Sequence, residues 1–158
     1  MDREEARKKV MEAALGIFKK FGIPIEMTVA SAHRSPQRAT AYAVSARQRG
    51  LKAIIAGAGH AAHLAGVLAA HTTLPVIGVP IDSSCLQGLD ALLSTVQMPP
   101  GIPVATVSIG KPGAKNAAIL AVQIMAVSDD ALSAQLENFK KEMAAQVEKK
   151  AEKLREYR

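Results

Sequence analysis

The segment from residue 31 to residue 36 combines a hydroxyl, an imidazole and a guanidinium, in the order Ser31-Ala32-His33-Arg34-Ser35-Pro36. An arginine fork binds phosphate through parallel hydrogen bonds, and histidine is the side chain whose pKa suits proton transfer near neutral pH. A helix beginning at Pro36 would direct its N-terminus, which attracts anions, toward the same place. The segment therefore predicts a phosphate and proton-transfer site; the alternative is a capping loop whose His33 and Arg34 are merely exposed.

A glycine turn follows the next apolar run and reads Gly57-Ala58-Gly59-His60-Ala61-Ala62-His63-Leu64. Small residues let a ligand approach the backbone, whose amides can bind a carboxylate or a phosphate. The spacing lacks the pattern of a dinucleotide fingerprint. His60 and His63 are one helical turn apart and could share a metal, but no acidic residue or cysteine lies near them in the sequence. We therefore expect no metal here.

Ser83, Ser84 and Cys85 follow a further apolar run. A serine or cysteine nucleophile needs a positioned base, and the sequence sets up none at a suitable spacing. We interpret these residues as a structural loop. Cys85 is the only cysteine, which excludes an internal disulfide framework and favours a reduced, cytoplasmic setting.

Apolar runs alternate with helical patterns along the chain. We predict strands at 23–31, 53–59, 74–81 and 104–110, helices at 2–21, 36–49, 60–71, 90–98 and 114–127, and a long amphipathic helix at 129–157. This alternation indicates an α/β fold with a parallel sheet covered on both faces, in a single domain over 1–158. Ligands of such sheets bind beyond the carboxyl ends of the strands, where the three polar segments described above are expected.

The composition limits the classes of partner. The 158 residues are 49% apolar but only 3% aromatic, so the core must consist of Ala, Val, Ile, Leu and Met. The net charge is +6, with basic pairs near both ends on predicted helices. We interpret them as solvated faces, because no arginine and aromatic residues interleave as on a nucleic-acid surface. The charged N-terminus is unlike a signal segment, and Gly, Pro and His interrupt the longest apolar stretches, so we expect no membrane partner either.

Several segments together resemble the carboxyaminoimidazole ribonucleotide mutase family, also called the phosphoribosylaminoimidazole carboxylase catalytic subunit. The resemblance runs from about residue 10 to 150 and rests on SAHRSP (31–36), IIAGAGHAAHLAG (54–66), LPVIGVPI (74–81), LQGLDALLSTVQMPPGIPVATVSIG (86–110) and NAAILAVQIMA (116–126). It implies a flavodoxin-like three-layer sandwich assembled into a homo-octamer whose active sites are made by more than one subunit.

The family resemblance also implies an activity in purine biosynthesis. Members move a carboxylate from an exocyclic nitrogen of an aminoimidazole ribonucleotide to a ring carbon, without a metal or an organic cofactor. By resemblance, His33 is the general acid and base, and Ser31 and Arg34 hold the nucleotide. The carboxylate pocket is lined by Ala58, Gly59, His63 and Leu64. The Ala61-to-Leu64 segment resembles the mutase branch more than the carboxylase branch.

Three features depart from the family pattern. The family's first strand and its Ser-x-Ser-Asp phosphate loop are absent, and an ungapped alignment puts Arg7 where the family aspartate belongs. His60 replaces the second of two paired glycines, and Ala65 replaces a proline. The charged helix start 2–9 is of the idealised kind used in design. The alternative to an active mutase is therefore an impaired or engineered subunit that serves as an oligomeric scaffold.

Overall fold

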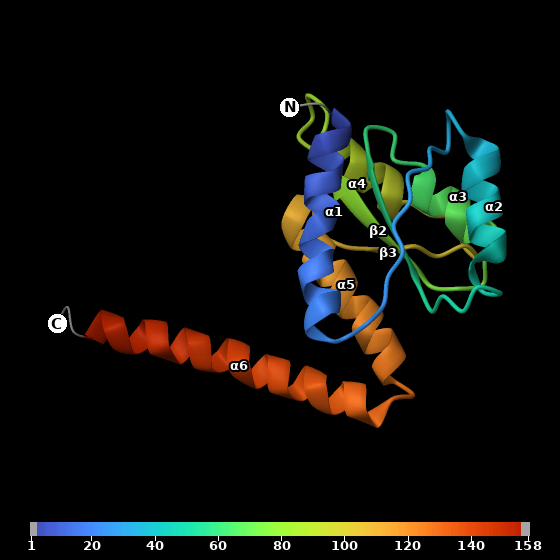
Figure 1. Cartoon of the computed structure of the whole chain (residues 1–158). Helices are drawn as coiled ribbons and strands as arrows, with labels where there is room; N and C mark the ends of the chain where they lie inside the picture. The colour runs from blue at the N-terminus through green and yellow to red at the C-terminus, as the bar shows by residue number, and fades with distance from the viewer. Residues whose placement is uncertain (1–2, 156–158) are drawn as a thin grey trace. The chain divides into compact units, whose positions relative to one another are not determined.

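The computed structural model describes residues 3–155 and contains six helices and three strands within that range. In chain order these are α1 Arg3–Lys20, α2 Pro36–Ala46, β1 Ile54–Gly59, α3 Leu64–Ala70, β2 Val76–Ile81, α4 Leu89–Val96, β3 Ala105–Thr106, α5 Gly110–Ala126 and α6 Asp130–Arg155 (Figure 1). The chain forms two compact units, Met1–Ala121 and Val122–Arg158. The strands and both loops that the sequence marks for chemistry lie in the first unit.

The three strands form one parallel sheet in the order β1-β2-β3. β1 and β2 pair over their full length, from Ile54 with Val76 to Gly59 with Ile81. Every residue of β2 is buried, as expected for a central strand covered on both faces. The prediction of a parallel α/β sheet is confirmed, although β3 is shorter than the predicted 104–110.

Helices cover both faces of this sheet. Gly78 of β2 lies against Thr95 of α4 and Ala65 of α3, so these two helices pack on one face. Gly57 of β1 has the opposite orientation and lies against Met11 of α1. Figure 1 shows α2 and α3 together on one side of the strands and α1 on the other. Helix, sheet and helix form the three layers that position the loops.

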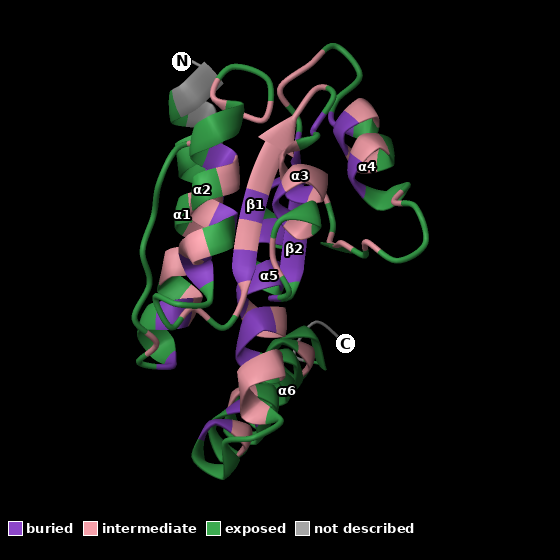
Figure 2. Ribbon diagram, turned by 90° about the vertical axis from the view of Figure 1, so that its right-hand side faces the viewer, coloured by how far each residue is buried: buried purple, intermediate pink, exposed green. Residues whose placement is uncertain are grey.

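Small side chains allow the layers to approach closely. Ala39, Ala43 and Ala46 of α2 are fully buried and belong to one apolar cluster with residues of β1, α3 and β2. The burial colouring of Figure 2 follows this pattern, with buried residues on β2 and on the inner face of α2. A core built from alanine and β-branched residues explains how the chain folds with almost no aromatic side chains.

The prediction of a strand at 23–31 is wrong. Residues 23–30 run without a strand partner, and Met27 and Val29 are 53% and 76% exposed. Arg38 donates hydrogen bonds to the Val29 carbonyl (2.7 Å) and to the Thr28 hydroxyl (2.8 Å), so side chains of α2 hold this segment instead of a ladder. The apolar alternation is that of a strand, but a strand forms only beside another strand, and the sheet of the described residues contains only β1, β2 and β3.

The same glycine-containing capping motif follows the first two helices. Gly22 and Gly50 have positive φ angles, and the residue after each donates a backbone hydrogen bond back into the helix: Ile23 to Phe18 and Leu51 to Ala46. This arrangement is the Schellman motif. α2 itself ends at Ala46, and the turn over residues 47–49 leads to Gly50, the residue at which the sequence predicts the helix to stop.

The second unit contains the end of α5 and the long helix α6. The Asp129 carboxylate accepts a hydrogen bond from the backbone N–H of Leu132 (2.9 Å) and so caps α6. Leu132 and Leu136 are buried, whereas Met143, Val147 and Leu154 of the predicted stripe are exposed. Among residues 3–155, no helix is long and apolar enough to cross a membrane.

Candidate functional site

Two polar loops follow the carboxyl ends of neighbouring strands. Residues 60–63 follow β1, and residues 82–88 follow β2. Because the strands are parallel and in register, Gly59 and Ile81 end side by side and both loops leave the same edge of the sheet. This is the edge at which parallel α/β sheets bind ligands.

Hydrogen bonds of its own two serine side chains stabilise the Ser31–Ser35 loop. The Ser31 backbone N–H donates to the Ser35 hydroxyl (2.9 Å), and the Ser31 hydroxyl accepts from the Arg34 backbone N–H (3.1 Å). Pro36 then begins α2 at a position where a missing N–H costs nothing. The serines fix the backbone, so His33 and Arg34 point outward and are exposed.

The structure brings His33 to His63 from thirty residues away. The His33 Nε2 and His63 Nδ1 atoms are 2.6 Å apart, and the rings meet edge to face with centroids 4.8 Å apart. One nitrogen must carry the proton and the other must accept it, because two protonated or two bare nitrogens cannot form this bond. The pair can therefore hold a proton and pass it on.

His60 makes a second link that the sequence did not predict. Its Nδ1 lies 3.1 Å from the Ser83 hydroxyl, so the contact joins the loop after β1 to the loop after β2. His60 and Ala62 adopt positive φ angles of 56° and 37°, so the predicted helix at 60–71 begins only at Leu64. The 23-residue separation of His60 and Ser83 gives no sequence signal, because the contact depends on strand register.

The remaining predicted site residues lie at the same edge. Ala58 and Gly59 end β1, and Leu64 begins α3 directly after His63. Gly59 has no room for a side chain, because the Ser83 hydroxyl occupies the space of a Cβ atom and the Ile81 carbonyl lies 3.0 Å from it. Among the residues that the structure describes, no three His, Cys, Asp or Glu side chains gather as metal ligands do.

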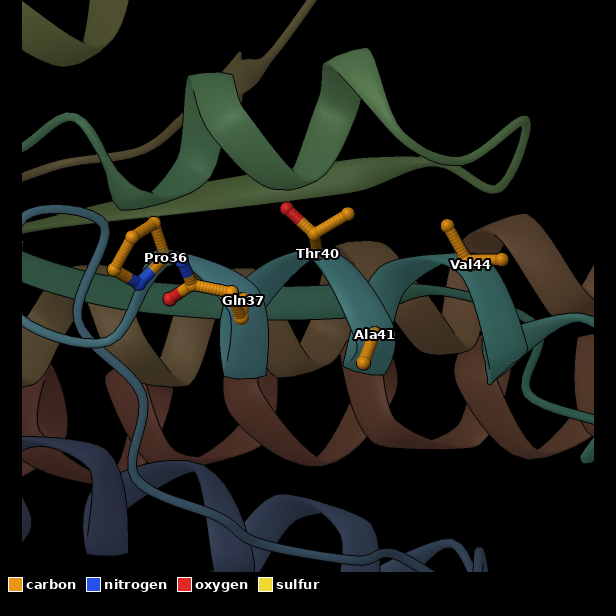
Figure 3. A pocket seen from close by; sticks show the side chains of 5 residues that line it. All are labelled: Pro36, Gln37, Thr40, Ala41 and Val44. Carbon is orange, nitrogen blue, oxygen red and sulfur yellow. The ribbon is translucent and has the colours of Figure 1, made fainter.

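A surface depression lies on the exposed side of α2, separate from these loops. Its lining is formed by Pro36, Gln37, Thr40, Ala41 and Val44 (Figure 3). None of these side chains is titratable, and none was predicted as a site residue. The histidine loops are therefore the better candidate for chemistry.

An electrostatic cluster beside α2 supports the extended segment 23–30. Arg49 and Glu26 form an ion pair, and the Arg49 guanidinium also stacks on the Tyr42 ring, 4.7 Å from its centroid. Hydrogen bonds from Arg49 and then from Tyr42 lower the pKa of Glu26. Burial, followed by the hydrogen bond to Glu26, raises the pKa of Tyr42. These groups lie outside the histidine loops, and we assign them a structural role.

Comparison with known families decides the identity of the chain. The model of the AIR carboxylase family matches residues 5–146, which is most of the sequence. The chain belongs to the AIR carboxylase family.

Other members of the family are similar over nearly the whole chain. An N5-carboxyaminoimidazole ribonucleotide mutase of Pyrococcus horikoshii is 54% identical over 147 residues, covering 93% of this chain and 82% of that protein. The mutase of Bacillus subtilis is 55% identical over 129 residues, 82% of this chain and 80% of the relative. A phosphoribosylaminoimidazole carboxylase of Saccharomyces cerevisiae is 53% identical over 145 residues, but the chain spans only 25% of that longer protein.

Solved structures support the fold assignment. Treponema denticola PurE superimposes with a TM-score of 0.78 at 24% sequence identity, covering 90% of this chain and 87% of that one. The AIR carboxylase family member described here is thus a flavodoxin-like α/β protein with a long C-terminal helix.

Proposed function

We propose that this chain is an N5-carboxyaminoimidazole ribonucleotide mutase of purine biosynthesis. The support is its membership of the AIR carboxylase family and its identity of more than 50% to relatives of that name. One structural observation carries the mechanism: the 2.6 Å contact between His33 and His63 at the ligand-binding edge of the sheet.

In the proposed reaction His33 donates one proton to the substrate and later takes one back, while His63 supports it. The exocyclic N–COO⁻ bond of the substrate breaks to release carbon dioxide, and protonated His33 donates a proton to that nitrogen. The ring carbon then attacks the trapped carbon dioxide, and its proton returns to His33. His63 accepts a hydrogen bond from His33 or donates one to it, and so stabilises whichever protonation state each step leaves. The atoms balance without a metal, an organic cofactor or a second substrate.

We assign binding roles to the residues around this pair. Arg34 is exposed next to His33, at the N-terminus of α2, and both the guanidinium and the helix end favour the ribose phosphate. The Ser31 hydroxyl accepts the Arg34 backbone N–H, and we assign Ser31 to binding of the same ligand. Ala58, Gly59, His63 and Leu64 would surround the carboxylate, at the end of β1 where the side chains are small.

The alternative, an impaired subunit kept as a scaffold, is less well supported. A scaffold would not need His33 and His63 in contact, yet the two loops bring them within hydrogen-bonding distance. The alternative depends on the ungapped alignment that puts Arg7 where the family aspartate is expected.

We further propose that copies of the chain associate, as an octamer by family resemblance. Helix α4 has an apolar stripe in the first unit, formed by Leu89, Leu93 and Val96, which are 52%, 50% and 48% exposed. Leu86, just before the helix, is 57% exposed and extends the stripe. Burying such a stripe against another copy would stabilise an assembly. Sedimentation of the wild type and of Leu93→Glu tests this, with a shift toward monomer expected in the variant.

Calorimetric titration with aminoimidazole ribonucleotide tests the function most directly. We expect binding by the wild type, binding weakened about tenfold or more in Arg34→Ala because a charged hydrogen bond is lost, and unchanged binding in Lys52→Ala. Lys52 is an exposed cation before β1, at the opposite end of that strand, so it controls for net charge. A wild type that neither binds nor converts the nucleotide would refute the proposal.

A further inference from the structure

His60 adopts a positive-φ backbone conformation, which is uncommon for residues other than glycine. Its φ of 56° lies in the left-handed region, which disfavours residues with a Cβ atom. In return its ring reaches Ser83, with 3.1 Å between Nδ1 and the hydroxyl oxygen. The conformation is therefore coupled to one specific contact, and that contact lies between the two loops of the candidate site.

The Ser83 hydroxyl has a defined place because it packs over Gly59 and contacts the His60 ring. It fills the space where a Cβ atom of Gly59 would stand, so it lies directly over the backbone at the end of β1. A tight turn in which the Ser83 N–H donates to the Ile81 carbonyl (3.0 Å) fixes its backbone. Ser83 as a whole is half-buried.

The orientation of the Ser83 proton depends on the tautomer of His60. If Nδ1 accepts, the only proton of the hydroxyl points at the ring and none remains for a ligand. If Nδ1 carries its proton and donates, the hydroxyl proton is free to point away from the ring. A site for a small anion needs donors, which favours the second arrangement.

We propose that Ser83 donates a hydrogen bond to the carboxylate of the substrate and that His60 is the positioning residue that holds it in place. This inference rests on the proposed mutase function. It adds a binding residue from the loop after β2 to a site otherwise built from the loop before α2 and the loop after β1. It also assigns a role to the histidine that replaces a glycine of the family pattern.

The test is a cycle of His60→Gly, Ser83→Ala and the double variant, with KM and kcat for the carboxyaminoimidazole ribonucleotide. Ser83→Ala should raise KM about tenfold with kcat little changed, because a hydrogen bond to a charged group is lost. His60→Gly should raise KM by roughly threefold to tenfold, since the hydroxyl remains but rotates freely. The double variant should match Ser83→Ala, because His60 acts only through Ser83.

Conservative and control variants separate positioning from folding. His60→Asn should recover part of the loss, since asparagine tolerates the left-handed region and its side chain can still contact Ser83. Ser94→Ala, within α4, and His71→Gly, after α3, should leave KM within about twofold, because neither lies in the two loops. Thermal unfolding of every variant identifies any that fail to fold.

Two results would overturn the proposal. KM of Ser83→Ala within twofold of the wild type would exclude the hydrogen bond to substrate, and additive effects in the double variant would show that His60 acts on its own. Nitrogen-15 NMR of histidine-labelled protein gives a readout without substrate: the His60 Nδ1 should be protonated, and its shift should move in Ser83→Ala. A bare Nδ1 would also refute the proposal. Absence of turnover in the wild type, by contrast, would count against the mutase function. The NMR result would still decide whether His60 donates a hydrogen bond to Ser83.

Discussion

A methyl group added at Gly59 should disrupt the candidate site. The ideal Cβ position overlaps the Ser83 hydroxyl, and it lies 3.0 Å from the Ile81 carbonyl and 3.2 Å from the Ser83 Cβ. Two of these neighbours are held by the backbone of β2 and its turn, so the side chain of Ser83 cannot simply rotate away from all of them. Gly59→Ala must therefore shift the loop after β2 away from the end of β1.

The expected effects differ in size between stability and activity. Overpacking of a closely packed position typically costs about 1–3 kcal/mol of unfolding free energy. Displacement of a site by about 1 Å can lower the rate about 100-fold, so we expect kcat/KM to fall by roughly that factor. Urea unfolding and steady-state kinetics of the same preparations measure the two quantities.

Two further variants make this reasoning refutable. Adding Ser83→Ala to Gly59→Ala removes the overlapping oxygen and should restore part of the stability, because the closest remaining side-chain atom lies 3.2 Å away. Gly16→Ala, in α1 where nothing lies within 4 Å of the new atom, should instead stabilise the protein by about 0.5–1 kcal/mol. If Gly59→Ala were as stable and active as the wild type, the packing of Ser83 over Gly59 would be disproved.

Three other variants probe the proton pair, the ion pair and the core. His33→Asn should lower kcat about 100-fold to 10,000-fold with little change in KM, whereas His71→Asn should not; kinetics that retain most of kcat would exclude His33 as the acid and base. Arg49→Met should raise the pKa of Glu26 toward its ordinary value, as seen by NMR titration. Because the wild-type pKa is lowered, the stabilisation is present above the ordinary carboxyl pKa and is lost as pH falls through the folded value, so the small difference in stability should vanish in acid. Ile77→Ala, fully buried in β2, should cost about 2–5 kcal/mol in urea unfolding, against less than about 0.5 kcal/mol for the exposed Val147→Ala.

Octameric assembly, the absence of a nucleic-acid partner and a cytoplasmic location stay predictions. The basic pairs Lys140-Lys141 and Lys149-Lys150 are exposed on α6. A filter-binding assay with a random oligonucleotide tests the interpretation that they form a solvated face, and salt-dependent binding would contradict it.

Local patterns in the sequence were sufficient for most of the elements. Apolar runs correctly indicated β1 and β2, and helical spacing indicated α1 and α6, because side-chain periodicity follows from backbone geometry alone. The segment 23–31 has an equally good strand pattern and forms no strand. Periodicity reports which residues suit a strand, but it carries no information on whether a partner strand is present.

The sequence by itself determined the chemistry that is available: a histidine and an arginine before α2, small residues at the end of β1, and the family to which these motifs belong. Only the tertiary structure decided which of them meet. The contact of His33 with His63 and that of His60 with Ser83 join residues 30 and 23 positions apart. The first contact joins the loop before α2 to the loop after β1, and the second depends on the register of β1 against β2. That register is set by packing across the whole layer, so the residues that touch cannot be inferred from their own neighbours in the chain.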